Sequence, residues 1–211
     1  MLKPIACLFL AAALAAALAS PSFAQATAWE IDSAHSNAQF SVRHLMISNV
    51  KGEFTRVTGT AQLDENDPMR SRVEVTIDTT TVNTREPKRD THLRSADFFD
   101  VGSYPTMTFR SKRMLPADQG KFKMIGDLTI RGVAHEVSFD VEGPTPAIKD
   151  PWGNVRVGAS ATARINRKDF GLLWNAPLET GGVLVGDEVT ISVDVELVKK
   201  APPANGAGGG K

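Results

Sequence analysis

Apolar and polar residues alternate with a period of two along most of the chain between residues 29 and 199. In the segment 38–44, for example, Phe40, Val42 and His44 share one face, and the residues between them are polar. This alternation is typical of antiparallel strands that are buried on one face only. The pattern predicts eight strands, over residues 38–44, 57–63, 73–80, 107–110, 121–130, 137–142, 154–165 and 189–198.

Helix is scarce in the same pattern. One short helix is predicted over residues 87–95, a polar stretch with Pro87 at its start and Asp90 in its first half. It interrupts the strand series once, where a barrel needs a lid or a crossover. Arg131-Gly132 stands between two predicted strands and predicts a tight hairpin turn.

An all-β fold of this size must protect the edges of its sheet, and closure into a barrel removes the edges altogether. We therefore predict an eight-stranded antiparallel barrel with one short helix. The interior of such a barrel is just wide enough to be filled by side chains or to hold one slender ligand. A two-sheet sandwich of immunoglobulin type is the alternative, although the chain lacks the Cys…Trp…Cys core of that fold.

The two ends of the 211-residue chain differ from its middle. Residues 1–24 combine Lys3, a short Ala/Leu-rich apolar run, and small residues at Ser22 and Ala24, which predicts a secretory signal peptide cleaved before Gln25. Residues 25–199 form the predicted domain, and the Pro- and Gly-rich residues 200–211 form a predicted disordered tail. The mature chain has no run long enough for an integral membrane helix.

Charge and cysteine content exclude several classes of function. Without Lys3 the mature chain carries 23 basic and 24 acidic residues, which argues against nucleic-acid binding driven by overall basicity. The single cysteine, Cys7, lies in the signal segment, so disulfides, thiolate catalysis and cysteine-based metal sites are excluded from the mature protein. We expect neither a cofactor nor a metal.

The mature chain has four histidines, and they give little support to catalysis. No G-x-S-x-G or H-E-x-x-H motif is present, and His35 and His44 would lie about 30 Å apart on an extended segment. His44 has the parity of an inward residue, so it is either a hydrogen-bonded core or rim histidine or a ligand contact. His92 follows a basic stretch, where a solvated histidine is the simpler interpretation.

Two local features could serve a binding site. Residues 85–94 have a small excess of basic side chains, which is either a solvated face or a collar for a phosphate or carboxylate head group bound by Arg94. Phe98 and Phe99 lie on one connection, and Phe170 and Trp174 lie on another. Large apolar residues on connections either seal the ends of a barrel or form the wall of a pocket.

Several ordered motifs carry a resemblance to a known family. They are His92-Leu93-Arg94-Ser95-Ala96-Asp97-Phe98-Phe99-Asp100 with Tyr104-Pro105 and Phe109-Arg110-Ser111, together with Asp32-Ser33-Ala34-His35-Ser36, Gly52-Glu53-Phe54, Gly126-Asp127-Leu128-Thr129-Ile130-Arg131-Gly132-Val133, Asn166-Arg167-Lys168-Asp169-Phe170-Gly171 and Val185-Gly186-Asp187-Glu188-Val189. From Trp29 to Leu197 the chain resembles the YceI-like polyisoprenoid-binding proteins.

The resemblance implies an elongated lipocalin-like barrel, exported to the periplasm, with an apolar tunnel. The expected partner is an amphiphilic lipid of the isoprenoid quinone or polyprenyl phosphate type, with a role in transport, storage or stress response. A homodimer is possible on these observations. We expect the lipid to contact fourteen side chains: Phe40, Val42, His44, Phe54, Val75, Ile77, Leu93, Arg94, Phe98, Phe109, Leu128, Phe139, Phe170 and Trp174.

Three functions are compatible with these observations. The first is an exported lipid-binding protein without catalysis. The second is a periplasmic enzyme that acts on an isoprenoid or acyl lipid through His44 and a nearby acid. The third is a structural stress protein whose cavity is incidental.

Overall fold

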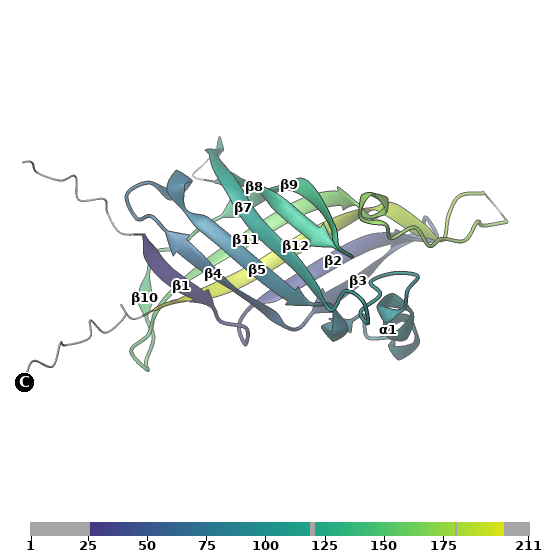
Figure 1. Ribbon diagram of the computed structural model, residues 1–211, viewed down its shortest axis with the longest axis horizontal. Coiled ribbons are helices and arrows are strands. Elements are labelled where there is room, and N and C mark those ends of the chain that lie inside the picture. The colour runs from purple at the N-terminus through teal and green to yellow at the C-terminus, as the bar shows by residue number, and fades with distance from the viewer. Residues whose placement is uncertain (1–25, 119–120, 180, 201–211) are drawn as a thin grey trace, which may run out of the picture.

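The computed structural model describes residues 26–118, 121–179 and 181–200, and strands dominate it (Figure 1). In chain order the strands are β1 (Thr27–Ile31), β2 (Asn37–His44), β3 (Ser48–Phe54), β4 (Val57–Leu63), β5 (Arg72–Asp78), β6 (Val82–Asn83), β7 (Thr106–Pro116), β8 (Phe122–Ile130), β9 (Val133–Glu142), β10 (Ile148–Lys149), β11 (Val155–Asn166) and β12 (Val185–Lys199). The helical elements are α1 (Pro87–Arg94) and the short 3-10 helices η1 (Pro68–Arg70), η2 (Thr79–Thr81) and η4 (Arg167–Phe170).

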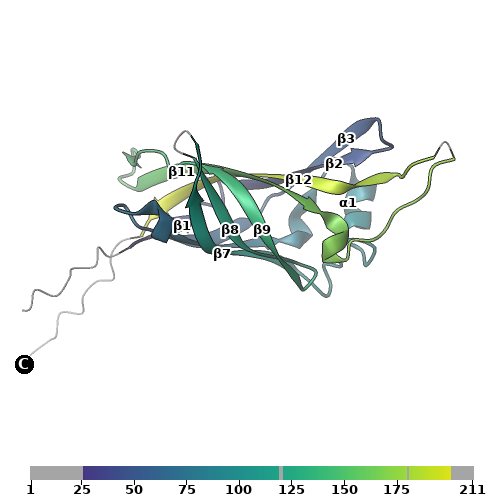
Figure 2. The same ribbon diagram turned by 90° about the horizontal axis from the view of Figure 1, so that it is seen from above.

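Eight of these strands close into an antiparallel barrel, as the alternation predicts. The order around the barrel is β1, β4, β5, β7, β8, β9, β11 and β12, and β12 pairs again with β1. β12 is long enough to pair with β1 near its C-terminal end and with β2 from Val185 to Asp194. The sheet β2–β3–β6 therefore prolongs one side of the barrel, and α1 lies at this prolonged end (Figures 1 and 2).

Each of the eight predicted strands has a counterpart in the structure, whereas β1, β3 and the two-residue strands β6 and β10 were not predicted. β1 has only five residues, too few for a clear period. In β3 the inward positions are Val50, Gly52 and Phe54, so a glycine interrupts the apolar series. A side chain at Gly52 would collide with the ring of Phe40 on the paired strand. The ring covers the glycine and supplies the apolar surface that β3 lacks at this position.

The turn and the helix that the sequence predicts are both present. Arg131 and Gly132 have φ angles of 49° and 73°, the left-handed values of a tight hairpin between β8 and β9. Asp90 of α1 is buried and accepts hydrogen bonds from the backbone N–H of Thr84 at 2.8 Å and from its hydroxyl at 2.5 Å. These bonds fasten α1 to the segment that follows β6.

The barrel interior is packed differently at its two ends. Near β1, a compact cluster fills the barrel and is formed by Trp29, Ile31, Ala38, Val57, Ala61, Val157 and Leu197. Toward α1, many inward side chains are only half-buried, among them Val75, Ile77 and Ile191. Because an inward residue gains exposure only where space lies inside the barrel, this half is hollow.

The predicted signal segment, the cleavage site before Gln25 and the tail from residue 201 lie outside the described residues. Within residues 26–118, 121–179 and 181–200, no helix combines the length and the apolar character that crossing a membrane requires.

Candidate ligand-binding cavity

The hollow half of the barrel encloses a cavity of about 450 Å³. Its wall consists of side chains from β2, β3, β5, β7, β8, β9, β11 and β12, and α1 covers part of one end. Arg43 and Lys88 line the cavity and are also exposed to solvent, so the cavity opens between the end of β2 and the start of α1. At the other end the cluster around Trp29 blocks the barrel. The cavity is therefore an apolar pocket with its opening beside α1.

Most of the side chains expected to contact a ligand do line this cavity. Twelve of the fourteen are in the wall: Phe40, Val42, His44, Phe54, Val75, Ile77, Leu93, Phe98, Phe109, Leu128, Phe139 and Trp174. Strand parity identifies inward residues because successive side chains of a strand point to opposite faces. Whether these residues bind a ligand stays a prediction.

Arg94 does not line the cavity, although it was expected to bind a head group, and that role stays a prediction. Its Nε donates to the carbonyl of Thr80 at 2.9 Å, and its Nη2 donates to the carbonyl of Val82 at 2.7 Å. The guanidinium therefore ties the last turn of α1 to η2 and β6. Its placement makes Arg94 a residue that positions the helix.

Phe170 also lies outside the cavity wall. It is 1 % exposed in η4 and packs against the ring of His135, with the ring centroids 5.1 Å apart. Phe170 thus belongs to the core that supports the wall from behind. Phe170 therefore helps to seal the end of the barrel and does not form the wall of the cavity.

An aromatic cluster forms the wall beside the opening. The ring of His92 lies edge-on to Trp174 at 4.7 Å and to Phe98 at 5.0 Å. Its Nε2 is 2.9 Å from a carboxylate oxygen of Asp97. His92 lines the cavity, and its side chain is also 37% exposed, so it is a solvent-contacting helix histidine that borders the cavity as well.

The basic stretch before and within α1 contributes only part of its charge to the cavity. Lys88 and Arg89 line the cavity, whereas Arg85 and Arg94 do not. Arg89 is engaged, since its Nε donates to the hydroxyl of Thr84 at 2.8 Å. A complete basic collar is therefore not present, and Lys88 is the cation of this stretch that projects at the opening.

Arg167 is a buried cation that reasoning from the residues did not single out. It is 3 % exposed, lines the cavity, and donates to the carbonyls of Gly186 and Trp174, each at 2.9 Å, and of Leu172. Burial lowers the pKa of its guanidinium from the usual value. Arg167 links the connection that carries Trp174 to β12. It lies within a motif that carries the family resemblance, but nothing in the motif tells which way its side chain points.

His44 is at the end of β2 and lines the cavity near the opening, as its parity predicts. Among the described residues, no acid forms a hydrogen bond or an ion pair with it. The arrangement thus gives no support to an acid–histidine pair at this position.

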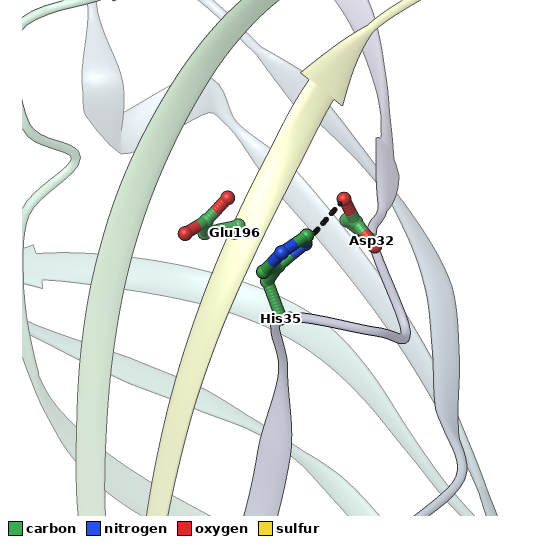
Figure 3. Close-up of side chains that lie close together, drawn as sticks. All are labelled: Asp32, His35 and Glu196. Atoms are coloured by element: carbon green, nitrogen blue, oxygen red, sulfur yellow. Dashed lines mark hydrogen bonds and ion pairs between the residues drawn. The ribbon is translucent and has the colours of Figure 1, made fainter.

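A separate polar cluster lies near the junction of β1 and β12 (Figure 3). Asp32 accepts a 2.9 Å hydrogen bond from His35, and Glu196 lies on the neighbouring strand. Arg156 donates to Asp32 at 2.6 Å and to Glu196 at 3.0 Å, and its Nε donates to Asp150 at 2.8 Å. Since a guanidinium already binds these carboxylates, the cluster is an ion-pair network at the closed end of the barrel.

The Arg156 guanidinium lowers the pKa of Asp32 to about 2 and holds the pKa of Asp150 well below its usual range. A carboxyl group with a lowered pKa stabilises the fold at pH values above its unfolded pKa, and this stabilisation is lost as the pH falls through the folded value. The network thus stabilises the barrel at neutral pH. The contribution of Asp32 is lost between about pH 4 and pH 2, and that of Asp150 decreases over the same range and is lost completely only at lower pH.

We expect Arg156→Gln to lower the free energy of unfolding at pH 7, and we expect the difference from the wild type to shrink as the pH falls from about 4 to about 2. Urea titrations at pH 7, 4 and 2.5 measure this difference. Arg110→Gln is the control because its exposed ion pair with Glu74 contributes little. A loss of stability that is the same at all three pH values would contradict this interpretation.

Fold and cavity together define a class of protein: elongated antiparallel barrels with an apolar internal cavity that opens at one end. The model of the YceI-like domain matches residues 29–197. The chain belongs to this family, which confirms the resemblance carried by its motifs.

Known proteins of this class share both sequence and fold with the chain. A UPF0312 protein of Staphylococcus aureus is 36% identical over 171 residues, which cover 81% of this chain and 97% of that protein. The crystal structure of the Campylobacter jejuni YCEI protein has a TM-score of 0.61 and 32% identity, covering 75% of this chain and 90% of that one. A polyisoprenoid binding domain from Saccharophagus degradans has a TM-score of 0.59 and 14% identity, covering 82% and 99%. At that identity it shows the shared fold alone.

Proposed function

We propose that the protein is an exported, non-catalytic binding protein that holds a polyisoprenoid or a similar amphiphilic lipid in its barrel. The observation that carries this proposal is the cavity, whose wall is almost wholly aliphatic and aromatic. Its volume of about 450 Å³ lies within the range of roughly 300–1,000 Å³ found for small-molecule sites. The name of the Saccharophagus degradans domain, a structural neighbour, points to the same class of ligand.

The distribution of polar groups favours one orientation of the lipid. The cluster around Trp29 closes the inner end, and Lys88 and Arg43 are at the opening. Each methylene group buried in such a wall contributes about 0.8 kcal/mol, so the apolar tail gains most from the inner part of the cavity. The head group then stays at the opening beside α1. If the lipid tail is longer than the cavity, the rest of the tail must lie outside the barrel.

Native mass spectrometry of the protein isolated from its source cells, combined with organic extraction, tests the proposal. We expect one lipid molecule per barrel, recovered chemically unmodified. Conversion of an added isoprenoid quinone or polyprenyl phosphate into a product would instead indicate an enzyme. A barrel that stays empty and takes up neither probe would indicate a structural role.

Export is a separate part of the proposal, with its own prediction. The small residues Ser22 and Ala24 lie at the −3 and −1 positions of the predicted cleavage site. We expect the intact mass of the protein from the periplasmic fraction to correspond to a chain that begins at Gln25. A product that still carries Cys7 would contradict cleavage at this site.

A further inference from the structure

Two segments project at the opening of the cavity and carry exposed apolar side chains. One is the turn between β2 and β3, with Leu45, Met46 and Ile47, and the other is the connection from η4 to β12, with Leu173. Ile47 is 76% exposed and Leu173 is 64% exposed. Both segments extend past α1 at the same end of the molecule (Figure 2). We call these four side chains the apolar rim.

The backbone of the turn is unfavourable for the residues that it carries. Leu45 and Met46 have φ angles of 52° and 62°, in the left-handed region that glycine and asparagine adopt most readily. The conformation is held in place, because Arg43 donates to the carbonyl of Met46 at 3.1 and 2.9 Å and the N–H of Leu45 donates to Leu184 at 2.9 Å. Backbone strain of this kind is concentrated at functional sites.

The apolar rim is continuous with the cavity wall. His44, which directly precedes the turn, lines the cavity, and so does Trp174, which directly follows Leu173. Leu184, which binds the turn, lines the cavity as well. An apolar surface therefore runs from the inside of the barrel to the tip of the turn.

Basic side chains flank this surface. Arg43 and Lys51 lie on the two strands of the hairpin, and Lys88 lies in the first turn of α1. Among the described residues, neither Lys51 nor Lys88 has an acid within ion-pair distance. Glu179 on the connection contributes an acid to the same end. Exposed apolar side chains beside lysines and arginines are the composition that binds the surface of an anionic bilayer.

We propose that the apolar rim docks on the surface of a phospholipid bilayer, with Leu45, Met46, Ile47 and Leu173 in the interfacial layer. Docking in this orientation brings the cavity opening against the membrane, so a lipid passes between bilayer and barrel without crossing water. This inference rests on the proposed lipid-binding function and names the surface from which the lipid is taken. Four side chains give reversible docking, as a carrier requires.

The experiment is flotation of the mature chain with vesicles of phosphatidylethanolamine and phosphatidylglycerol. We expect the double variant Met46→Ser/Ile47→Ser to reduce the bound fraction at least about tenfold and Ile47→Trp to increase it. The matched control is Trp152→Ser, because Trp152 is 82% exposed in the turn between β10 and β11, at the opposite end of the barrel (Figure 1). This control should bind vesicles like the wild type.

Three results would overturn the proposal: a wild type that does not float, a rim variant that floats like the wild type, or a loss of flotation caused by Trp152→Ser. Light scattering without vesicles can give a fourth result that would overturn it. If the wild type is a dimer and the rim variant is a monomer, the apolar rim serves self-association. Uptake of an isoprenoid quinone from detergent solution tests the lipid-binding function separately. The rim variant should retain this uptake, since its changes lie outside the cavity wall.

Discussion

Ile77→Glu should give a folded barrel that has lost its lipid. Ile77 lines the cavity and is only half-buried although it points inward, so a longer polar side chain has space and water in the empty protein. Burying an unpaired carboxylate against an apolar lipid tail costs several kcal/mol of binding free energy. Each loss of about 1.4 kcal/mol weakens binding about tenfold. We expect uptake of an isoprenoid quinone to fall by roughly 100-fold or more while the far-UV circular dichroism is unchanged.

Thr76→Glu is the matched control, because it places the same side chain one residue earlier on β5, on the outer face of the barrel. It should bind the quinone like the wild type. Asp78 would be a poorer choice, because its carboxylate accepts a 3.0 Å hydrogen bond from the backbone N–H of Thr80 and begins η2. A folded Ile77→Glu variant that keeps its lipid would show that the lipid does not contact β5.

The neighbouring wall residue Phe139 should respond differently to the same substitution. It is 5 % exposed and its ring packs edge-on against Phe109 at 5.1 Å, so a glutamate there would replace this aromatic contact with a carboxylate among buried apolar side chains. We expect Phe139→Glu to unfold the domain. The contrast follows from packing, since both residues line the cavity but Ile77 is half-buried, whereas Phe139 is part of the buried core.

Arg167→Met should cause a large loss of stability in a domain that still folds. The change removes a guanidinium that donates to the carbonyls of Leu172, Trp174 and Gly186, and it leaves these buried acceptors without partners. Each unsatisfied buried group costs about 1–3 kcal/mol, so we expect a loss of roughly 3–5 kcal/mol in the free energy of unfolding. Out of a total of about 5–15 kcal/mol, this is a large fraction. Urea titration measures it.

Lys168→Met is the matched control for this substitution. Lys168 is the next residue and forms a 2.8 Å ion pair with Asp187, but both side chains are about two-fifths exposed. Exposed pairs contribute about 0–1 kcal/mol. If Arg167→Met were no less stable than Lys168→Met, the carbonyls around Arg167 would have to be satisfied in another way, and its anchoring role would be wrong.

Alternation along the chain predicted the barrel fold and most of the cavity wall, because strand parity decides which residues point inward, but it missed β1, which completes the ring of eight strands. It could not predict β3, where Phe40 on the neighbouring strand covers Gly52. That contact depends on strand pairing, which no local pattern encodes.

Residues on the helix and the connections were harder to place. Arg94 and Arg167 are both arginines in family motifs, but Arg94 reaches back over η2 while Arg167 borders the cavity. The partners of a long side chain depend on the tertiary structure, so strand parity does not predict where its charged group lies. The contact of His92 with the cavity was not predicted for the same reason: the docking of α1 against Trp174 brings its ring into the wall, while its side chain stays partly exposed to solvent.

The cluster around Trp29 that closes one end of the barrel has a consequence for the kinetics of exchange. A pocket with one opening cannot receive a lipid at one end and release another at the opposite end, so arrival and departure use the same path. A donor and an acceptor must then compete for that path and act in turn. The expected rate law is that of a substituted, ping-pong exchange, in which a saturating concentration of acceptor slows reloading from the donor.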